Sequence, residues 1–217
     1  MIKANFYLRN VLAVAIILAG FMCSVCAQNN QTQPKTTYTQ DAGVVINGVK
    51  WATRNVDAAG TFAATPESAG MFYQWNRKKA WNSTDDKVTG WDSSKSKGTT
   101  WATANNLSPA GWRVPTYEEL ETLIDETKVT SAWTTQNGVT GRKFTDRTTG
   151  ASIFLPAAGY RNYSNGTLNY RGFYGYYWSS TVNNASDAHY MYFSSAGQTT
   201  YSDAYKSHGL SVRCVAK

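Results

Sequence analysis

The stretch that decides the interpretation of this chain is its last third, residues 157–215. It reads AAGYRNYSNGTLNYRGFYGYYWSST over 157–181, VNNASDAHYMYFSSAGQTTYSDAYKSHG over 182–209 and LSVRCV over 210–215. Ten of the fourteen tyrosines and both histidines lie there, and Asn, Ser, Gly and Asp fill most of the gaps. Tyr offers a rigid amphipathic surface and Ser, Asn and Gly offer adaptable hydrogen bonds, a composition typical of binding loops. An aromatic-rich β-domain whose tyrosines support its own loops is the alternative interpretation.

The other end of the chain, residues 1–27, is typical of a secretion signal. Lys3 and Arg9 give it a positive start, and residues 11–22 form an apolar run that is short for a membrane span. Val25-Cys26-Ala27 fits a cleavage site. We therefore expect an exported protein, secreted or associated with the cell surface, without a transmembrane span in the mature chain.

The three cysteines predict a domain without internal disulfides. Cys23 and Cys26 lie in the signal, and neither follows the small residue that lipid anchoring requires, so cleavage and release are favoured over a lipoprotein. Cys214 is then alone in the mature chain. Because it alternates with Leu210 and Val212, we expect a small buried side chain on a strand face rather than a nucleophile.

The charge of the mature chain gives no sign of a nucleic-acid partner. Lys3 and Arg9 are two of the 21 basic residues and all 14 acidic residues lie beyond the signal, so its removal lowers the net charge from +7 to +5. The charges are scattered, and the one short cluster, Arg77-Lys78-Lys79, is typical of a solvated turn.

Beyond the signal, residues 28–43 are polar and predict a flexible tether, and residues 44–217 form the expected folded domain. Residues 44–51 contain two short β-runs around Asn47-Gly48, the dipeptide with the strongest hairpin preference. This hairpin is expected to begin the domain.

Two short helices are expected between the strands. The first covers residues 99–107, with Thr99 or Thr100 as its N-cap and Pro109 as its stop. The second runs from Tyr117 to about Thr127. Thr116 and Glu119 have the spacing of a capping box before it, and Tyr117, Leu120 and Ile124 give it one apolar face. The glutamates of its first turn, Glu118, Glu119 and Glu121, are best explained by the helix dipole.

Strands are expected over residues 141–145 and 151–155, as a pair, and over 176–181, 188–193 and 210–215. In residues 188–193 the alternation places Met191 and Phe193 on one face and Tyr190 and Tyr192 on the other. If the first pair faces a core, the two tyrosines face outward.

Four ordered blocks carry a family resemblance: Gly111-Trp112-Arg113-Val114-Pro115-Thr116, Leu155-Pro156-Ala157-Ala158-Gly159-Tyr160-Arg161, Gly175-Tyr176-Tyr177-Trp178-Ser179-Ser180-Thr181 and Ser211-Val212-Arg213-Cys214-Val215. They resemble the Fibrobacter succinogenes major paralogous domain, an exported bacterial family with a C-type-lectin-like fold that is distantly similar to the formylglycine-generating enzyme.

The resemblance implies an α+β, C-type-lectin-like single domain with small antiparallel sheets, two short helices and long irregular loops. It implies that residues 44–51 lie beside residues 210–215 and that Trp112 and Trp178 belong to the core. The irregular region before the last strand would form an exposed ligand face.

Residues 160–208 also look like the variable region of target proteins of diversity-generating retroelements, which copy a template repeat into the 3′ end of a gene with mutations at adenines. Mutated Asn codons reach Tyr, Ser, Asp, His, Gly and Phe but no stop codon. Binding loops under ordinary selection would have a similar composition. The positions that such mutagenesis can produce, and that we take as the candidate ligand-binding face, are Asn162, Tyr163, Asn169, Tyr170, Phe173, Tyr174, Asn183, Asn184, Ser186, Asp187, His189, Tyr190, Tyr192, Tyr201, Ser202, Asp203, Tyr205, Ser207 and His208.

Motifs of the neighbouring families are missing. Trp75-Asn76-Arg77 and Trp81-Asn82-Ser83 lack the final acid of the Trp-Asn-Asp calcium motif of sugar-binding lectins, and Cys214 lacks the partner that the oxidase chemistry of the formylglycine-generating enzyme needs. His189 and His208 have no spaced Cys or carboxylate partners. Neither a phosphate loop nor Gly-x-Ser-x-Gly occurs. We therefore expect no catalytic residues, no metal site and no cofactor.

Three functions follow as hypotheses. The first is an exported ligand-binding module that presents residues 160–208 to an extracellular protein or glycan, with diversification by a retroelement as a narrower hypothesis. The second is a structural or adhesive subunit of a bacterial surface assembly. An enzyme derived from the formylglycine-generating scaffold is the least favoured.

Overall fold

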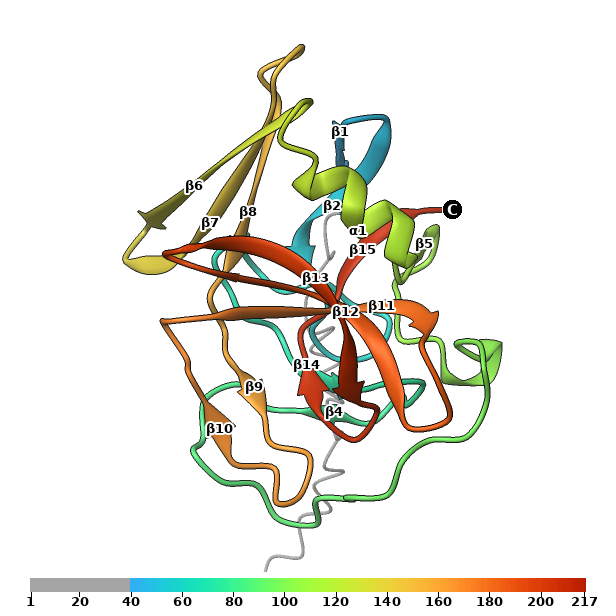
Figure 1. Ribbon diagram of the computed structural model, residues 1–217. Helices are drawn as coiled ribbons and strands as arrows, with labels where there is room; N and C mark the ends of the chain where they lie inside the picture. The colour runs from blue at the N-terminus through green and yellow to red at the C-terminus, as the bar shows by residue number, and fades with distance from the viewer. Residues whose placement is uncertain (1–39) are drawn as a thin grey trace, which may run out of the picture. The chain divides into compact units, whose positions relative to one another are not determined.

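The computed structural model describes residues 40–217, which form fifteen strands, one α-helix and one 3-10 turn (Figure 1). The predicted signal and most of the predicted tether lie outside the described residues. Within residues 40–217 no helix has the length and apolar character needed to cross a membrane.

The strands form four small sheets whose neighbours pair antiparallel. The first, in spatial order, contains β1 (Val44–Ile46), β2 (Val49–Asn55), β15 (Arg213–Ala216) and β5 (Trp112–Arg113). The second contains β10 (Leu168–Asn169), β9 (Tyr160–Arg161), β14 (Gly209–Leu210), β3 (Phe72–Gln74) and β4 (Ala80–Trp81). The third contains β11 (Gly175–Val182), β12 (Asp187–Ser194) and β13 (Gly197–Tyr205). The fourth contains β6 (Val129–Gln136), β7 (Val139–Asp146) and β8 (Ser152–Pro156).

The expected α+β class with two helices is wrong. The described chain is mostly β-strand with one α-helix, and residues 99–107 form only the 3-10 turn η1 (Thr103–Asn105). The Asn76 side-chain oxygen accepts hydrogen bonds from the Ala102 amide at 2.7 Å and from the Asn105 side chain at 3.2 Å. These contacts fix the backbone from outside the segment. Because no side chain caps η1, neither Thr99 nor Thr100 starts a helix.

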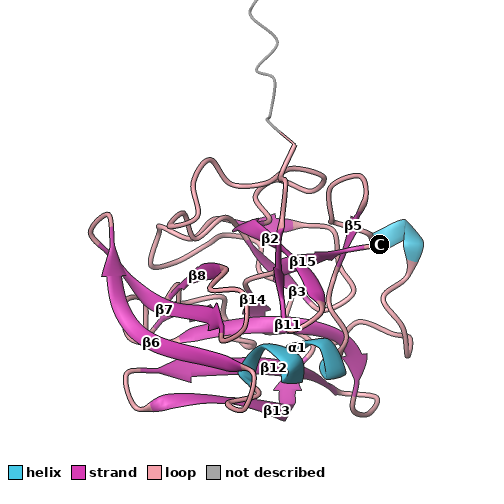
Figure 2. Cartoon of the chain, turned by 90° about the horizontal axis from the view of Figure 1, so that it is seen from above, coloured by secondary structure: helices cyan, strands magenta, loops and turns pink. Residues whose placement is uncertain are grey.

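The hairpin that begins the domain is confirmed. Asn47 and Gly48 both adopt left-handed backbone conformations, with φ of 46° and 79°, and connect β1 to β2. On its other edge β2 pairs with β15, with Trp51 opposite Val215 (Figure 2). The expected neighbourhood of the N-terminal and C-terminal strands is therefore confirmed.

The helix α1 (Tyr117–Ile124) is confirmed with its capping box. Thr116 Oγ1 accepts from the Glu119 amide at 3.3 Å, and a Glu119 carboxylate oxygen accepts from the Thr116 amide at 2.8 Å. Glu119 also binds the Arg113 guanidinium with two contacts, of 2.7 and 2.5 Å. The helix ends earlier than Thr127 because the Asp125 carboxylate accepts from the Thr127 amide at 2.9 Å and turns the chain.

Two buried clusters hold the sheets together, and both framework tryptophans are core residues as expected. Trp112 and Trp178 belong to the first cluster, and the Trp178 indole donates to the Tyr73 carbonyl at 2.7 Å. In the second cluster Leu120 and Leu123 of α1 pack with Phe193 and other residues of the third sheet. Cys214 is fully buried as predicted, and burial raises the pKa of its thiol to about 12.

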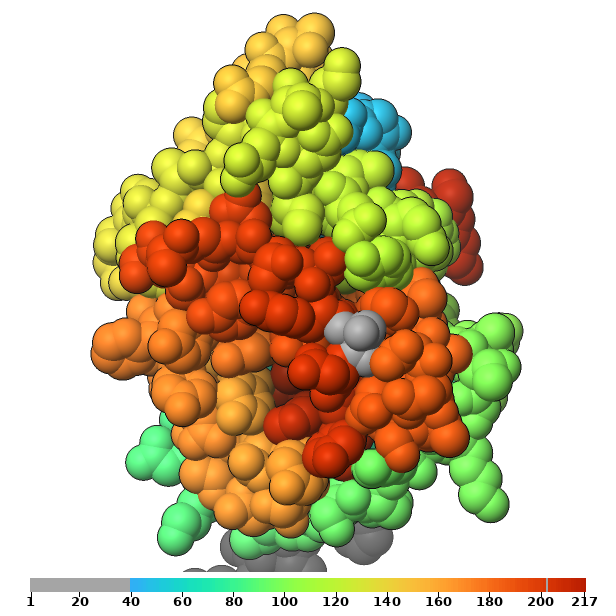
Figure 3. Space-filling view, in the orientation of Figure 1, coloured from blue at the N-terminus to red at the C-terminus, as the bar shows by residue number. Residues whose placement is uncertain are grey.

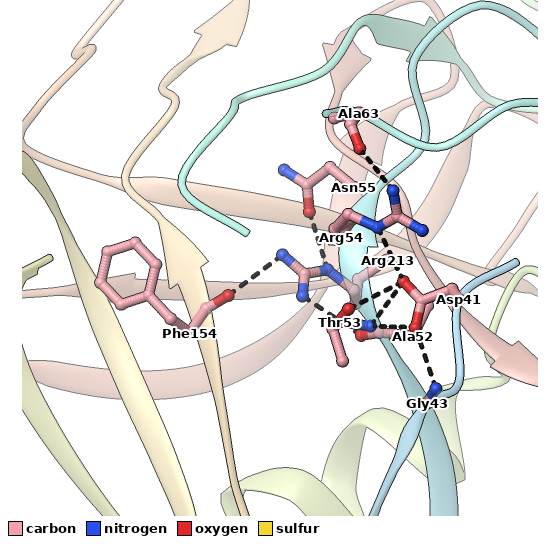
Figure 4. A network of polar contacts seen from close by, with 9 residues as sticks. All are labelled: Asp41, Gly43, Ala52, Thr53, Arg54, Asn55, Ala63, Phe154 and Arg213. Atoms are coloured by element: carbon pink, nitrogen blue, oxygen red, sulfur yellow. Dashed lines mark hydrogen bonds and ion pairs between the residues drawn. The ribbon is translucent and has the colours of Figure 1, made fainter. Parts of the chain in front are cut away.

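A buried guanidinium fastens β15 to its neighbours (Figure 4). Arg213 donates to the Asn55 side-chain oxygen at 2.9 Å and to the carbonyls of Ala52 and Phe154 at 3.2 and 3.1 Å. Burial lowers the pKa of this guanidinium. Next to it, the Asp41 carboxylate accepts from the Thr53 backbone and side chain and anchors the start of the described chain.

Most of the expected strands form, and one element differs in a way that matters for function. Strands β7, β8, β11 and β12 confirm four predictions, whereas the predicted strand 210–215 is divided into β14 and β15 because the chain passes from the second sheet to the first. The region before it was expected to be long and irregular. That expectation is wrong, because Gly197–Tyr205 forms β13 and completes the third sheet.

Candidate functional site

The third sheet has two chemically different faces. Tyr177, Met191 and Phe193 point to the side of α1 and are at most 1 % exposed. Alternate residues point the other way, where Tyr176, Tyr190 and Tyr192 are only partly buried. Strand pairing places these rings in neighbouring rows, since Tyr176 lies opposite Tyr192, and Tyr190 lies opposite Tyr201 of β13. The sheet thus displays tyrosines on the face opposite α1, where Tyr176 and Tyr190 pack against the buried cluster that contains Trp178.

The segment from β9 to β11 adds a second row of rings beside this sheet. Tyr160 lies 4.8 Å from Tyr176, and Tyr174 lies 5.5 Å from Tyr192, measured between ring centroids. Tyr170 contacts both Tyr160, at 6.0 Å, and Tyr174, at 4.9 Å. These distances are those of favourable aromatic pairs, each of which contributes about 0.5–1.5 kcal/mol beyond burial.

Two glycines allow close approaches of the chain in this region. A Cβ on Gly159, whose φ is 73°, would lie 2.1 Å from the Asn169 carbonyl oxygen, so only glycine lets the loop close. A Cβ on Gly175 would lie 2.1 Å from the Phe193 ring, which therefore packs directly on the β11 backbone. Both glycines occur in the sequence blocks that carry the family resemblance.

A third group of rings continues the cluster toward β14. Tyr163 lies 4.9 Å from Tyr205 and 5.1 Å from the His208 imidazole, which in turn lies 5.2 Å from Tyr160. The Lys95 ammonium lies 4.0 Å from the centroid of Tyr205, a cation–π contact.

These rings form one connected surface that we call the tyrosine face. Figure 3 shows the segment that carries it, in orange and red, over much of one side of the molecule. Two of its rings are well exposed, Tyr170 at 53 % and Tyr201 at 46 %. The members of the tyrosine face are Tyr160, Tyr163, Tyr170, Tyr174, Tyr176, Tyr190, Tyr192, Tyr201, Tyr205 and His208.

A cavity of about 260 Å³ opens within the tyrosine face. The Tyr190 hydroxyl donates to the Asp203 carboxylate at 3.3 Å beside it. The residues that line the cavity are Tyr160, Tyr176, Tyr190, Asp203, Ala204, His208 and Leu210.

Burial determines the protonation states of the phenols and the imidazole that line the cavity. It raises the pKa values of Tyr160, Tyr176 and Tyr190, so these phenols stay neutral at pH 7. It lowers the pKa of His208, whose Nδ1 lies 3.3 Å from the Arg161 carbonyl oxygen, so the imidazole is neutral as well. Asp203 is the only acidic residue that lines the cavity.

Most of the candidate residues lie on or beside the tyrosine face. Asn162, Asn169 and Phe173 lie in the segment that carries the second row of rings, and Phe173 is 68 % exposed. A turn between β11 and β12 is held by bonds among its own members, such as Asn184 Nδ2 to Asp187 at 2.9 Å. The candidates in the turn are Asn183, Asn184, Ser186 and Asp187, and Ser202 lies in β13. The candidates on the face or its cavity are Tyr163, Tyr170, Tyr174, Tyr190, Tyr192, Tyr201, Asp203, Tyr205 and His208.

Two candidates lie apart from this surface. His189 belongs to the face of β12 that points toward α1, where its ring is 4.4 Å from Tyr117. Ser207 is fully buried. Conversely, Tyr160 and Tyr176 line the cavity although neither was among the candidates, and both belong to the blocks that carry the family resemblance. Tyr176 directly follows Gly175 and precedes the buried Trp178 by two residues, and this position did not indicate a site residue. Its alternation with Tyr177 along the strand could have indicated that the two side chains point to opposite faces.

The described residues contain no group of three His, Cys, Asp or Glu side chains that could hold a metal ion. His189 and His208 lie on different sides of the third sheet, and the buried thiol of Cys214 has a pKa raised to about 12.

A larger hollow, of about 620 Å³, lies elsewhere on the described residues. Its lining includes two cationic side chains, Lys217 and Arg113, of which Arg113 is bound by Glu119, together with Trp101, Thr103 and Val182 but no Asp or Glu side chain. The smaller cavity combines three neutral phenols, an imidazole and a carboxylate that accepts a hydrogen bond from Tyr190, and it adjoins an exposed aromatic surface. We therefore take the tyrosine face as the candidate site.

Comparison with known proteins gives one result. A family model described as the Fibrobacter succinogenes major domain matches residues 22–216. No curated protein and no solved structure matches the chain, so nothing confirms the C-type-lectin-like architecture that the sequence resemblance implied.

Proposed function

The chain belongs to the Fibrobacter succinogenes major domain family, and from that premise we propose that it is an exported ligand-binding module that uses the tyrosine face to bind an extracellular protein or glycan. The observation that carries the proposal is the convergence of nine tyrosines from β9 to β13 on one surface. Four of the nine, Tyr163, Tyr170, Tyr201 and Tyr205, are 38 to 53 % exposed, whereas Tyr177 on the other side of the sheet is 1 % exposed.

The face has the physical properties of a binding surface. Its rings are positioned by strand pairing and by mutual contacts of 4.8 to 6.3 Å, so little conformational entropy is lost on binding. Exposed tyrosines such as Tyr170 and Tyr201 can contribute both apolar area and a hydroxyl group. Aromatic residues of this kind supply hot spots of at least about 2 kcal/mol in protein interfaces.

Diversification by a retroelement is the narrower part of the proposal. It is supported by the separation between framework and face: Trp178 and Cys214 are fully buried, whereas most positions of Asn, Tyr, Ser or Asp type are accessible. Sequencing the 3′ end of this gene across a natural population tests it. Substitutions concentrated at Tyr170, Tyr201 and Asp203 would support diversification, and an invariant segment would contradict it.

A structural or adhesive subunit of a surface assembly is the alternative function. The exposed Phe173 beside Tyr170 favours it, because a large exposed aromatic side chain is also typical of a subunit interface. Stable self-association of the purified protein, lost in Phe173→Ser, would support this alternative. We propose no catalytic role for the cavity.

The test of the proposed function compares the mature protein with a face variant on a glycan microarray and in selections from a displayed peptide library. The face variant combines Tyr170→Ser, Tyr174→Ser, Tyr192→Ser and Tyr201→Ser, none of which lines the cavity. Tyr117→Ser, on the α1 side of the sheet, is the matched control. Binding that the face variant loses and the control keeps supports the proposal. Equal binding by both variants, or the absence of any ligand for the unchanged protein, contradicts it.

A further inference from the structure

The cavity in the tyrosine face combines neutral aromatic rings with a single carboxylate. Tyr160 and Tyr176 meet edge to face at 4.8 Å, and Tyr176 and Tyr190 stack at 6.0 Å. The Asp203 carboxylate is held beside them by the Tyr190 hydroxyl at 3.3 Å and is itself exposed to solvent. Aromatic faces attract cations electrostatically, and a carboxylate in the same cavity adds to this attraction.

We infer that this cavity is an aromatic cage for an organic ammonium group, either the trimethylammonium group of a small molecule or the side-chain ammonium of a lysine in a protein ligand. The inference rests on the proposed function, because it assigns the chemistry of the group that enters the cavity. It does not require the exposed rings of the face variant, which lie outside the cavity.

The charges around the cavity favour a cation. Asp203 lines it, and Asp187 lies near enough to act on His208 together with Asp203. Three basic side chains near the tyrosine face are already engaged: Lys95 lies over the Tyr205 ring, Lys206 Nζ donates to the Gly98 carbonyl at 3.0 Å, and Arg161 donates to the carbonyl oxygens of residues 82, 85 and 166. An anionic ligand would meet the Asp203 carboxylate without a free lining cation.

The Lys95 contact shows that this surface attracts ammonium groups. Its Nζ lies 4.0 Å from the Tyr205 centroid, well within the range of a cation–π interaction. The cavity itself, at about 260 Å³, has room for several water molecules of about 30 Å³ each, and so for a trimethylammonium group. An inorganic metal ion fits less well, because the described residues supply one carboxylate there and no three-ligand group.

The experiment titrates the mature protein with three probes and records the tyrosine ring signals by NMR and the heat of binding by calorimetry. Choline carries a trimethylammonium group, and 3,3-dimethylbutan-1-ol is its neutral isostere of the same shape. Nα-acetyl-lysine methylamide presents a lysine ammonium. Choline or the lysine amide, whichever binds more tightly, identifies the source of the ammonium group.

Variants separate the two contributions of the cage. Asp203→Asn keeps the shape and the hydrogen bond of Tyr190 but removes the charge, and we expect it to weaken ammonium binding by about tenfold. Tyr176→Leu removes an aromatic face and is expected to weaken binding about fivefold, whereas Tyr176→Phe keeps the face and the affinity. Glu118→Gln, an exposed carboxylate on α1, is the charge control and should change nothing.

The results expected are binding of an ammonium probe, no binding of the neutral isostere, and loss of affinity in Asp203→Asn but not in Glu118→Gln. Equal binding of choline and its isostere, no binding of either ammonium probe, or unchanged affinity in Asp203→Asn would overturn the inference. If ammonium probes fail while the face variant still loses its glycan or peptide ligands, the cage is refuted and the proposed function stands. If ammonium probes bind and the face variant loses nothing, the cage stands and the proposed function is refuted.

Discussion

Tyr176 and Tyr177 are adjacent in the chain and point to opposite faces of the third sheet, so the same substitution should lower stability at Tyr177 and change it little at Tyr176. Tyr177 is 1 % exposed, donates to the Pro156 carbonyl at 2.8 Å and accepts from Asn55 Nδ2 at 3.3 Å. Tyr176 is partly exposed and lines the cavity. Phe at either position keeps the ring and removes only the hydroxyl group.

The magnitude follows from the bonds that remain. In Tyr177→Phe the Pro156 carbonyl still accepts from the Ala158 amide at 2.9 Å, and Asn55 Nδ2 still donates to the Ala69 carbonyl at 3.0 Å. No partner is left wholly unsatisfied, so we expect the loss of two net hydrogen bonds, about 1–2 kcal/mol of unfolding free energy. In Tyr176→Phe solvent replaces what the hydroxyl loses, and the change should stay within about 0.5 kcal/mol.

Urea unfolding of residues 28–217, followed by tryptophan fluorescence and by circular dichroism, measures both values. Coincident transitions are required for the two-state treatment. Equal losses for the two variants, or a larger loss for Tyr176→Phe, would refute the assignment of one face to the core and the other to a ligand.

Three further predictions concern stability. Burial raises the pKa values of Tyr177 and Cys214 to about 12, so the unfolded state releases their protons at lower pH than the folded state does. The free energy of unfolding should therefore be full below about pH 9 and fall as the pH rises toward 12. Urea midpoints between about pH 8 and 11 should show this fall, and a less steep one in Tyr177→Phe. Burial acts to raise the pKa of Asp41, but hydrogen bonds from Thr53 and Gly43 overcome this effect and lower that pKa. The stability that Asp41 contributes should therefore be lost as the pH falls below about 4. Asp41→Asn should lower the free energy of unfolding by about 1–2 kcal/mol at pH 7 and by less at pH 3. In Gly159→Ala the new Cβ would meet the Asn169 oxygen at 2.1 Å, so this variant should lose more than about 2 kcal/mol of unfolding free energy and show broadened ring signals of Tyr160 and Tyr170. Gly172→Ala, with a φ of 82° and open space around it, should lose about 1 kcal/mol. Equal shifts of the thermal midpoint in the two variants would contradict the packing.

The framework was predictable from the sequence because its signals are local. Asn47-Gly48 specifies a hairpin, and Thr116 with Glu119 specifies a helix start, whatever the rest of the chain does. The alternation of Met191 and Phe193 with Tyr190 and Tyr192 was sufficient to orient β12.

The errors arose where structure depends on distant partners. Residues 99–107 do not form a helix because Asn76, which is distant in sequence, binds Ala102 and Asn105. Strand β13 is composed mainly of polar residues and Tyr, and it becomes a strand by pairing with β12 rather than through its own pattern. The expectation of an irregular ligand face came from the family resemblance, and β13 contradicts it.

The candidate site was predictable in composition but not in membership. Tyrosine density indicated the surface, yet density cannot tell that His189 points toward α1 or that Ser207 is buried. Tyr160 and Tyr176 were missed because their neighbours in the framework blocks, such as Arg161 and Trp178, are core residues. Which side of a strand a residue occupies decides this, and bulges in β12 and β13 shift that register.

The central claim is that the tyrosine face, and not the larger hollow, binds the ligand. The most direct measurement takes one peptide or glycan selected with the mature protein and determines its Kd for two variants. One carries Tyr170→Ser and Tyr201→Ser on the face, and the other carries Thr103→Ala and Val182→Ala in the hollow of about 620 Å³. We predict at least a tenfold loss for the face variant and unchanged affinity for the hollow variant. Unchanged affinity in the face variant together with a loss in the hollow variant would contradict the account.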